Sequence, residues 1–411
     1  MLMLPKNRRF HLIYLFYPII LMVPVLWLFN VGAMGMQSEL ENRNKAAFPV
    51  IAIKTLWKDW QKDGDNLPTQ IQRAASDQFP GRLNLILLAK RIDRLAISTA
   101  YALLPDAAIP AERKGDIYTM RDHSLLVQRP DSFNPDLQHD IDLHIENYQY
   151  MIDHYPEINF QVFFIDTLKA SSFHPANNFF WDADAGRCLD YFEAHKPDEL
   201  AFSKLELGSI EDHTRWFYRT DHHWNVNGIL ESYAIIHAML KKHYPEISPM
   251  LVPARLITFE DIYFSGSHAR SAFDTELYDQ FIVEDLNFPP FIILQNNKVT
   301  AYNHRVEYLN GNYSTVSFSG HYGAFYGLDA GMLEYVFEND FDRRLLIIGS
   351  SYTNAIEPML AAHYYHTYAV DLRHYGKFSF SEFIKEYPVD DVLMIGDCSV
   401  VARTLGWEIL P

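Results

Sequence analysis

The chain has 411 residues, 48% of them hydrophobic and 21% charged, which is typical of a folded protein and excludes a disordered one. Its formal net charge of −17 would repel a phosphate backbone, so nucleic acid is excluded as a partner. The two cysteines, Cys188 and Cys398, are too few for a disulfide framework, and the sequence leaves open whether they pair.

The N-terminus has the features of a membrane anchor. Residues 1–9 hold three basic side chains and no acid, and Phe10–Ser38 carries no charged side chain when its histidine is neutral. The apolar run is long enough to cross a bilayer, and its basic flank predicts a cytoplasmic N-terminus with the bulk of the chain outside. We favour a retained single-pass anchor over residues 1–38, because the run exceeds a usual signal core. Cleavage near Ala33, which would give a secreted protein, is the alternative.

Residues 39–115 are predicted to form a juxtamembrane and helical segment. Asp77–Arg82 contains Pro and Gly and breaks the chain. Residues 83–98 then place leucine and isoleucine at helical spacing, which predicts a packing helix with no chemistry of its own.

The rest of the chain predicts an α/β fold. Phe160–Asp166 is typical of a buried strand, and strands and helices alternate from residue 344 onward. Such alternation indicates a parallel sheet with helices on its faces. The predicted elements are strands at Leu345–Ile348, Thr367–Asp371 and Asp391–Ile395, with helices at Thr353–Ala362 and Phe380–Tyr387. Residues 249–330 are the least periodic, and we expect an irregular insertion there with short strands, Phe291–Leu294 among them.

The segment Trp216–Gly228 concentrates reactive side chains just before a predicted helix over residues 225–244. Either asparagine near its end, Asn225 or Asn227, can cap that helix. An Asp two residues before a His, as in Asp221 and His223, can accept the ring N–H and leave the other nitrogen free as a base.

A candidate nucleophile lies about 130 residues further on, in Arg344–Thr353. Four apolar residues predict a buried strand, Gly349 permits a sharp turn, and Ser351 falls where a helix begins. A serine at such a turn is exposed, and its own N–H points toward a developing oxyanion.

Together the two segments resemble the DHHW family and the alginate O-acetyltransferase-like members of the SGNH hydrolase superfamily. In those proteins an Asp-x-His-Trp element precedes a Gly-x-Ser element, the reverse of the usual SGNH order. The matching residues are Asp221, His223, Trp224, Gly349 and Ser351, and weaker similarity extends from Glu39 to near the C-terminus. One departure is Ser350, which stands where ordinary SGNH enzymes carry Asp.

The resemblance implies an SGNH-hydrolase-like parallel sheet with circularly permuted motif order, in a catalytic domain over residues 116–411 with an insertion at about 249–330. It implies a catalytic triad of Ser351 as nucleophile, His223 as base and Asp221 as orienting carboxylate. It also implies O-acetylation of an exopolysaccharide outside the cell membrane, often alongside a membrane-bound O-acyltransferase partner. No cofactor is predicted.

Each proposed triad residue also has a purely structural explanation. Ser351 and Asp221 are both suited to cap helices, and His223 to pack as a hydrogen-bonded turn histidine. The two motifs in the family's order favour catalysis over these readings.

Four residues are candidates for substrate binding. Arg373 and Tyr375 follow a predicted strand, and an Arg can hold a carboxylate or acyl oxygen or form a structural ion pair. Trp224 can wall an acyl pocket or pack beneath the turn. A second oxyanion donor is sought in the Phe264–Ser267 turn or in the side chain of Asn354.

Other functions stay open from the sequence alone. No metal is predicted, because adjacent histidines rarely bind one ion and no His-x-x-x-His helix pair is present. The alternatives are a carbohydrate acetylesterase and a non-catalytic glycan-binding or assembly protein on the same fold. A strongly polyanionic glycan would need a local basic groove, which the net charge does not suggest.

Overall fold

The computed structural model describes residues 37–38, 43–47, 66–79, 81–103, 112–114, 116–120, 124–177, 180, 182–301, 303–327, 329–401 and 407–408. The chain divides into two compact units, Met1–Ala100 and Tyr101–Pro411. Apart from Gln37–Ser38, the predicted anchor lies outside the described residues, as does the alternative cleavage site near Ala33. Within these ranges, no helix combines the length and the apolar character needed to cross a membrane.

The described residues of the first unit form two helices and a short strand pair. Strands β1 (Gln37–Ser38) and β2 (Arg43–Asn44) pair antiparallel, and α3 (Leu67–Asp77) is capped by Asn66. Helix α4 (Arg82–Leu103) includes the residues of the helix predicted over 83–98, and it ends at the start of the second unit.

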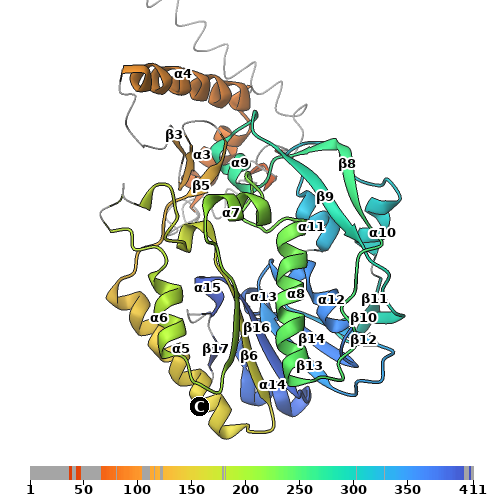
Figure 1. The fold of residues 1–411 in the computed structure, drawn as a ribbon. Helices are drawn as coiled ribbons and strands as arrows, with labels where there is room; N and C mark the ends of the chain where they lie inside the picture. Colours follow the sequence, from red (N-terminus) through yellow and green to blue (C-terminus); the bar gives the residue numbers. More distant parts are fainter. Residues whose placement is uncertain are drawn as a thin grey trace, which may run out of the picture. The chain divides into compact units, whose positions relative to one another are not determined.

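An eight-stranded mixed sheet forms the centre of the second unit, as Figure 1 shows, in the order β11-β10-β12-β14-β13-β16-β6-β7. Five neighbouring strands from β14 to β7 are parallel, which confirms the expected α/β architecture with a large sheet. The other three add antiparallel at one edge, so the sheet is not wholly parallel as predicted. The strands are β6 (Asn159–Ile165), β7 (Ala201–Leu205), β10 (Phe291–Gln295), β11 (Lys298–Thr300), β12 (Met332–Phe337), β13 (Arg344–Gly349), β14 (His366–Asp371) and β16 (Asp391–Gly396).

Helices cover both faces of this sheet (Figure 1). Successive side chains of a strand point to opposite faces, so Leu345 and Ile347 of β13 join one core while Leu346 and Ile348 join the other. The first core is completed by α8 (Val226–His243) and α12 (Glu357–Ala361). The second is completed by α5 (Pro135–His154), α6 (Arg187–His195) and α14 (Phe380–Glu386). A strand buried on both faces explains the continuous apolar run in the sequence.

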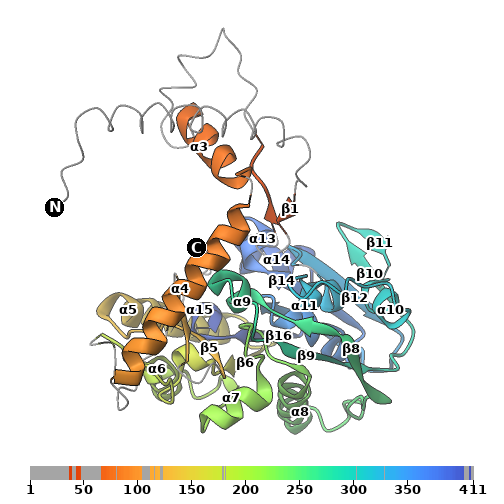
Figure 2. The ribbon, with the colours of Figure 1, turned by 90° about the horizontal axis from the view of Figure 1, so that it is seen from above.

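Residues 249–330 are more regular than the sequence predicts. Strand β8 (Arg255–Phe264) pairs antiparallel with β9 (Asp279–Asp285), and the two lie side by side in Figure 2. The register shifts between Phe259 and Tyr263, and this irregularity destroys the inside–outside alternation on which a strand prediction depends. The predicted strand at Phe291–Leu294 is β10. The same region contains the helices α9 (Ser267–Ala272), α10 (Asn303–Leu309) and α11 (His321–Tyr326).

The remaining elements are short. The helix predicted over Thr353–Ala362 is divided into the 3-10 turn η3 (Thr353–Ala355) and α12, because Pro358 has no N–H to continue the helical ladder. The strands β3 (Glu112–Lys114), β4 (Ile117–Thr119) and β5 (Leu126–Gln128) form an antiparallel sheet. The strands β15 (Phe378–Ser379) and β17 (Trp407–Glu408) form a parallel pair. The other elements are η1 (Leu168–Ala170), α7 (Ile210–Trp216), α13 (Leu372–Tyr375) and α15 (Cys398–Val401).

A disulfide joins Cys188 in α6 to Cys398 in α15, across 210 residues of sequence. The pairing answers the question that the sequence left open. It links a helix on one face of the sheet to the segment that follows β16.

We expect the Cys188→Ser/Cys398→Ser double variant to lose about 2–5 kcal/mol of unfolding free energy, because the cross-link restrains the unfolded chain. Urea denaturation monitored by circular dichroism measures the loss. Thiol titration of the denatured parent chain provides the control, with no thiol before reduction and two after it. Two titratable thiols before reduction would contradict the bridge.

Candidate active site

A closed turn before α8 presents the carboxylate and imidazole of the first motif. An isolated antiparallel bridge joins Phe217 to Trp224 and closes the loop between them. Inside the loop, Thr220 donates through its backbone N–H (2.9 Å) and its hydroxyl (2.6 Å) to the buried carboxylate of Asp279. Because Asp279 belongs to β9, the turn is fixed to the β8–β9 pair as well as to its own helix.

Asn225 connects this turn to α8. Its side-chain oxygen accepts hydrogen bonds from the N–H groups of Asn227 (2.9 Å) and Gly228 (3.3 Å), which identifies Asn225 as the N-cap. Its amide nitrogen donates to the carbonyl of Phe217 at 3.1 Å. One side chain therefore fixes both the start of the helix and the base of the turn.

Asp221, His223 and Ser351 form a continuous hydrogen-bonded chain. His223 Nδ1 lies 2.6 Å from Asp221 Oδ1, and His223 Nε2 lies 2.9 Å from Ser351 Oγ. An ionised carboxylate can only accept, so Nδ1 donates its N–H to Asp221. The other ring nitrogen is then the acceptor for the Ser351 hydroxyl proton. Of the two adjacent histidines, it is His223 that faces the serine.

The carboxylate of Asp221 is buried and surrounded by donors. Its Oδ1 also accepts the backbone N–H of His223 at 2.9 Å, and its Oδ2 accepts the N–H of Ser267 at 2.6 Å. Burial alone would raise the pKa of Asp221, but the neighbouring His223 and His222 and these hydrogen bonds outweigh it and hold the pKa well below the usual value. Asp221 is therefore ionised at neutral pH.

The sequence suggested that the turn at Phe264–Ser267 supplies a second oxyanion donor. In the structure this turn instead holds Asp221. The N–H of Ser267 is directed at Asp221. A Cβ on Gly266 would lie only 2.3 Å from both Cβ and Oδ2 of Asp221, so no larger residue fits without moving the carboxylate.

Ser351 lies just beyond the C-terminal end of β13, which is a central strand of the sheet. This is the edge at which open α/β sheets carry their sites. Gly349 makes the turn tight, because an added Cβ would lie 2.1 Å from Cγ2 of Thr353. The chain thus reverses sharply and leaves Ser351 partly exposed next to His223.

Tyr322 of α11 is a site residue that sequence reasoning missed. Its ring stacks on the imidazole of His223, with centroids 3.9 Å apart and planes 12° apart. Its hydroxyl accepts from Trp224 Nε1 at 3.0 Å and lies 3.4 Å from the carbonyl of Ser351. Tyr322 lies outside both motifs, and no spacing rule relates it to them. Trp224 is fully buried beneath the turn, so packing, one of the two alternatives for this residue, is the one observed.

Comparison with solved structures establishes the fold. PatB1 from Bacillus cereus superimposes with a TM-score of 0.54 at 19% identity, over 70% of this chain and 98% of that one. PatB1 with a sulfonyl adduct gives 0.55 at 18% identity, over 70% and 96%. A DHHW family protein from Eubacterium siraeum gives 0.51 at 17% identity, over 70% and 92%.

The chain shares its fold with a DHHW family protein. The resemblance drawn from the two motifs is thus confirmed at the level of the fold. No family model matches the sequence, and no curated protein matches it.

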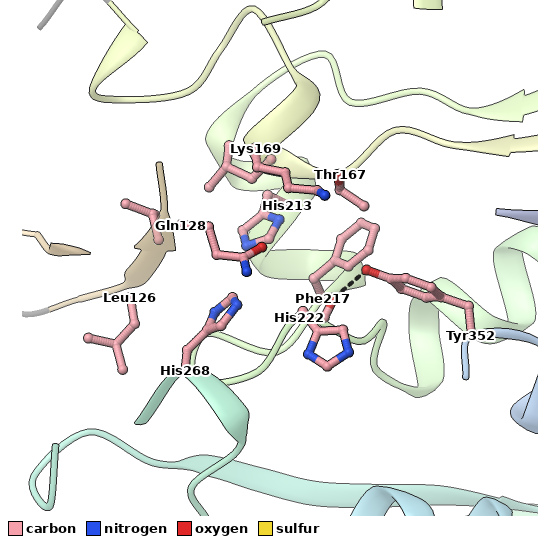
Figure 3. A pocket seen from close by; sticks show the side chains of 11 residues that line it. Leu126, Gln128, Thr167, Lys169, His213, Phe217, His222, His268 and Tyr352 are labelled. Carbon is pink, nitrogen blue, oxygen red and sulfur yellow. Dashed lines mark hydrogen bonds between the residues drawn. The ribbon is translucent and has the colours of Figure 1, made fainter. Parts of the chain in front are cut away.

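A small cavity lies next to His222. Figure 3 shows His213, His222 and His268 turned toward it, with Lys169 and Tyr352 at its margin. Its volume of about 30 Å³ accommodates one or two water-sized groups, and not a sugar. Burial lowers the pKa of His213 and of His222 to about 3 and that of His268 to about 4, so all three are neutral at physiological pH.

His222 supports the site without reaching the serine. Its Nδ1 lies 2.8 Å from the hydroxyl of Ser267, and its backbone carbonyl accepts from the Tyr352 hydroxyl at 2.7 Å. Because Tyr352 follows Ser351 directly, the latter bond joins the two motifs next to the serine.

The two candidates that follow β14 are both engaged in structural contacts. Arg373 forms ion pairs with Asp371, at 2.9 Å from Nε to Oδ1, and with Asp329 at 3.0 Å. The structural ion pair, one of the two alternatives for this residue, is therefore the one observed. Tyr375 packs edge-on against Phe378, on the side of the second core.

Asn354 uses both of its amide hydrogens. The side-chain nitrogen donates to the carbonyl of Gly327 at 3.2 Å and to Asp329 at 3.1 Å. It is therefore not available as an oxyanion donor, but it does line the large cavity described below.

Two groups of potential metal ligands occur among the described residues. The first comprises Asp221, His222 and His223, whose facing atoms are already hydrogen-bonded to one another and to serines. The second comprises Asp329, Asp371 and His374, where the guanidinium of Arg373 already pairs with both carboxylates.

A large cavity of about 530 Å³ lies between α11, η3, α12 and the antiparallel edge of the sheet. Residues from all of these elements line it, among them Gln295, Thr300, Gly323, Asp329, Asn354 and Glu357. Glu357 is buried and accepts from Tyr335 at 3.2 Å and from Thr353 at 2.5 Å. Burial nevertheless raises its pKa to about 7.

We expect Gly266→Ala to slow the modification of Ser351 by a sulfonyl fluoride by about 100-fold or more, because a displaced Asp221 would no longer orient the imidazole that accepts the Ser351 hydroxyl proton. Intact-mass spectrometry follows the labelling rate. Gly208→Ala is the matched control, since its methyl would meet only the side-chain oxygen of Asp212, at 3.2 Å. Equal rates for the two variants would show that the close approach at Gly266 is unimportant.

Glu357 predicts a pH dependence of stability. Its pKa is about 7 in the fold against 4.5 ordinarily, so between these values the folded chain retains a proton that the unfolded chain has released. Stability should therefore fall by up to about 3 kcal/mol as the pH rises through this window, and then level off. Urea denaturation at pH 4.5 to 8 measures the slope, which Glu357→Gln should flatten and the exposed-site control Glu260→Gln should not. An unchanged slope in Glu357→Gln would contradict the assignment.

Proposed function

We propose that this protein transfers an acyl group, most simply acetyl, to a polysaccharide hydroxyl outside the membrane, through an ester on Ser351. The observation that carries the proposal is the hydrogen-bonded chain from Asp221 through His223 to Ser351, at 2.6 and 2.9 Å. A free serine is too weakly acidic to attack an ester, and this arrangement supplies the base that it needs.

The reaction then proceeds in two balanced halves. The oxygen of Ser351 attacks the donor carbonyl while its proton passes to Nε2 of His223. The donor's C–O bond breaks, and the leaving oxygen takes that proton from His223. In the second half an acceptor hydroxyl gives its proton to His223 and attacks the acyl carbon, and Ser351 leaves and regains the proton. Asp221 stabilises the imidazolium that forms each time.

We assign the backbone N–H of Ser351 as one oxyanion donor, because it lies at the turn that follows β13. Tyr322 has a positioning role. Its ring restrains the imidazole from one side, and its hydroxyl joins the buried Trp224 to the serine turn.

The acetyl group and the polysaccharide acceptor are proposed from the resemblance of the two motifs to the alginate O-acetyltransferase-like proteins. PatB1, which shares the fold, has been solved with a sulfonyl adduct. Sulfonyl reagents react with activated serines, so they are suitable probes for Ser351 in this chain.

An extracytoplasmic location is part of the proposal. The Cys188–Cys398 disulfide supports it, because such bonds persist in oxidising compartments. The apolar run at Phe10–Ser38 would provide the anchor, or the signal cleaved near Ala33. A membrane-bound O-acyltransferase is the proposed source of the acyl group.

We expect Ser351→Ala and His223→Ala to lower the hydrolysis of a chromogenic acetate by about 10⁴-fold or more, and Asp221→Asn by about 10³–10⁴-fold. Purified protein and initial rates are sufficient. His222→Gln is the control, since its ring does not reach the serine, and it should retain most of the rate. Circular dichroism verifies that each variant is folded.

Two outcomes would favour the alternatives. If cells carrying Ser351→Ala acetylated their exopolysaccharide normally, the non-catalytic glycan-binding function would replace this one. If water always intercepted the acyl group, even with abundant sugar acceptors, the protein would be a carbohydrate acetylesterase. Stoichiometric metal in the purified protein, together with loss of hydrolysis on chelation, would contradict the serine mechanism altogether.

A further inference from the structure

The walls of the large cavity are continuous with the segments that hold Ser351. In α11, Tyr322 stacks on His223, and the next two residues, Gly323 and Ala324, line the cavity. Asn354 lines it from η3, three residues after Ser351, so the two Cα atoms are at most about 11 Å apart. The hydrogen bond from Asn354 to the carbonyl of Gly327 joins the two walls.

The cavity has the size and lining of a ligand site. Its volume of about 530 Å³ lies within the range of small-molecule pockets, roughly 300–1,000 Å³, whereas the small cavity next to His222 is far below it. Gln295 and Thr300 offer both donors and acceptors, and small residues such as Ala301 leave space between them. Such a mixture suits hydroxyl-rich ligands.

The charge of the lining is negative. It includes Asp329 and Glu357, and no Lys or Arg belongs to it among the described residues. His304 also lines the cavity, but burial and the neighbouring Arg305 lower its pKa to about 4, so it is uncharged at neutral pH.

Cations near the cavity offset this charge only in part. Arg373 is held between Asp329 and Asp371, and Arg305 pairs with Glu284 at 2.8 Å. Lys298, opposite Gln295 in the β10–β11 hairpin, is exposed and lies outside the lining. A sugar carboxylate in the cavity would therefore face Asp329, whose arginine is shared with a second acid, and Glu357, which is partly ionised at neutral pH, without a free positive partner.

We infer that this cavity binds the acceptor polysaccharide next to Ser351, and that the sugar units it accepts carry no negative charge. The inference rests on the proposed acyl transfer for its reaction, in which the acceptor O–H proton passes to His223 and the ester moves from Ser351 to the sugar oxygen. It excludes polyuronates as the preferred acceptor. Neutral and amino-sugar polymers both meet these requirements, because they offer hydroxyl groups and carry no negative charge.

The first test measures acceptor preference. Purified full-length protein is supplied with a chromogenic acetate and with cello-oligosaccharide, chito-oligosaccharide or oligogalacturonate, and acetylated products are quantified by mass spectrometry. We expect at least tenfold more product from one or both of the first two than from oligogalacturonate. Preference for the cationic chito-oligosaccharide would identify the acceptor as an amino-sugar polymer. Equal use of cello-oligosaccharide and chito-oligosaccharide would identify it as a neutral polymer. Oligogalacturonate used as well as the others would overturn the inference.

The second test changes the charge of the cavity. Ala301 is exposed at the lining, so Ala301→Lys and its uncharged partner Ala301→Gln should both fold. We expect Ala301→Lys, but not Ala301→Gln, to reduce the preference against oligogalacturonate by about tenfold. Hydrolysis of the acetate without acceptor is measured in both variants, so that a change in acceptor preference is separated from a change in the reaction itself. An unchanged preference in Ala301→Lys would show that the acceptor binds elsewhere.

Binding measurements separate this inference from the proposed reaction. Ser351→Ala retains every residue of the cavity lining, and calorimetry with the same oligosaccharides reports on binding alone. If the parent protein hydrolyses no acetate but Ser351→Ala still prefers uncharged sugars, the cavity assignment stands and the reaction fails. If hydrolysis depends on Ser351 but the variant binds oligogalacturonate best, the reaction stands and the cavity assignment fails.

Discussion

The hydrogen bond between Asp221 and His223 is the constraint on which the rest of the site depends. A carboxylate with so little exposed surface is costly unless donors surround it, and here two backbone N–H groups and an imidazole do so. The β8–β9 pair and the N-cap of α8 hold the turn that carries Asp221, and Gly266 lies directly against its carboxylate. The positions of the turn and of the imidazole are therefore determined together.

The serine reaches this imidazole through the sheet. Strand β13 is covered by helices on both faces, so its end is fixed to within the tolerance of a packed core. Tyr322 and Tyr352 then join the serine turn to the histidine turn, by ring stacking and by a hydrogen bond to the carbonyl of His222. Rigid elements on two sides hold the Oγ–Nε2 distance, which suits a site whose chemistry depends on orientation.

The same elements extend from the triad to the large cavity. Helix α11 presents Tyr322 to the histidine and Gly323 to the cavity, and η3 carries Asn354 just after the serine. Acidic side chains remain on the cavity wall, while each nearby arginine is consumed by an ion pair. In this way the local electrostatics follow the sign of the net charge, and in the proposed reaction they would bear on the choice of acceptor more than on the chemistry at the serine.

By itself the sequence determined the local features: the strand that ends at Gly349 and the helix capped after His223. These follow from residue type and short-range spacing, which the backbone obeys within a few residues. Only the tertiary structure decided that Trp224 packs inside, that Arg373 is paired with acids, and that the Phe264–Ser267 turn serves Asp221. It also revealed Tyr322, the antiparallel edge of the sheet and the Cys188–Cys398 pairing. Each of these depends on contacts between segments far apart in the chain, for which the sequence carries no periodic signal.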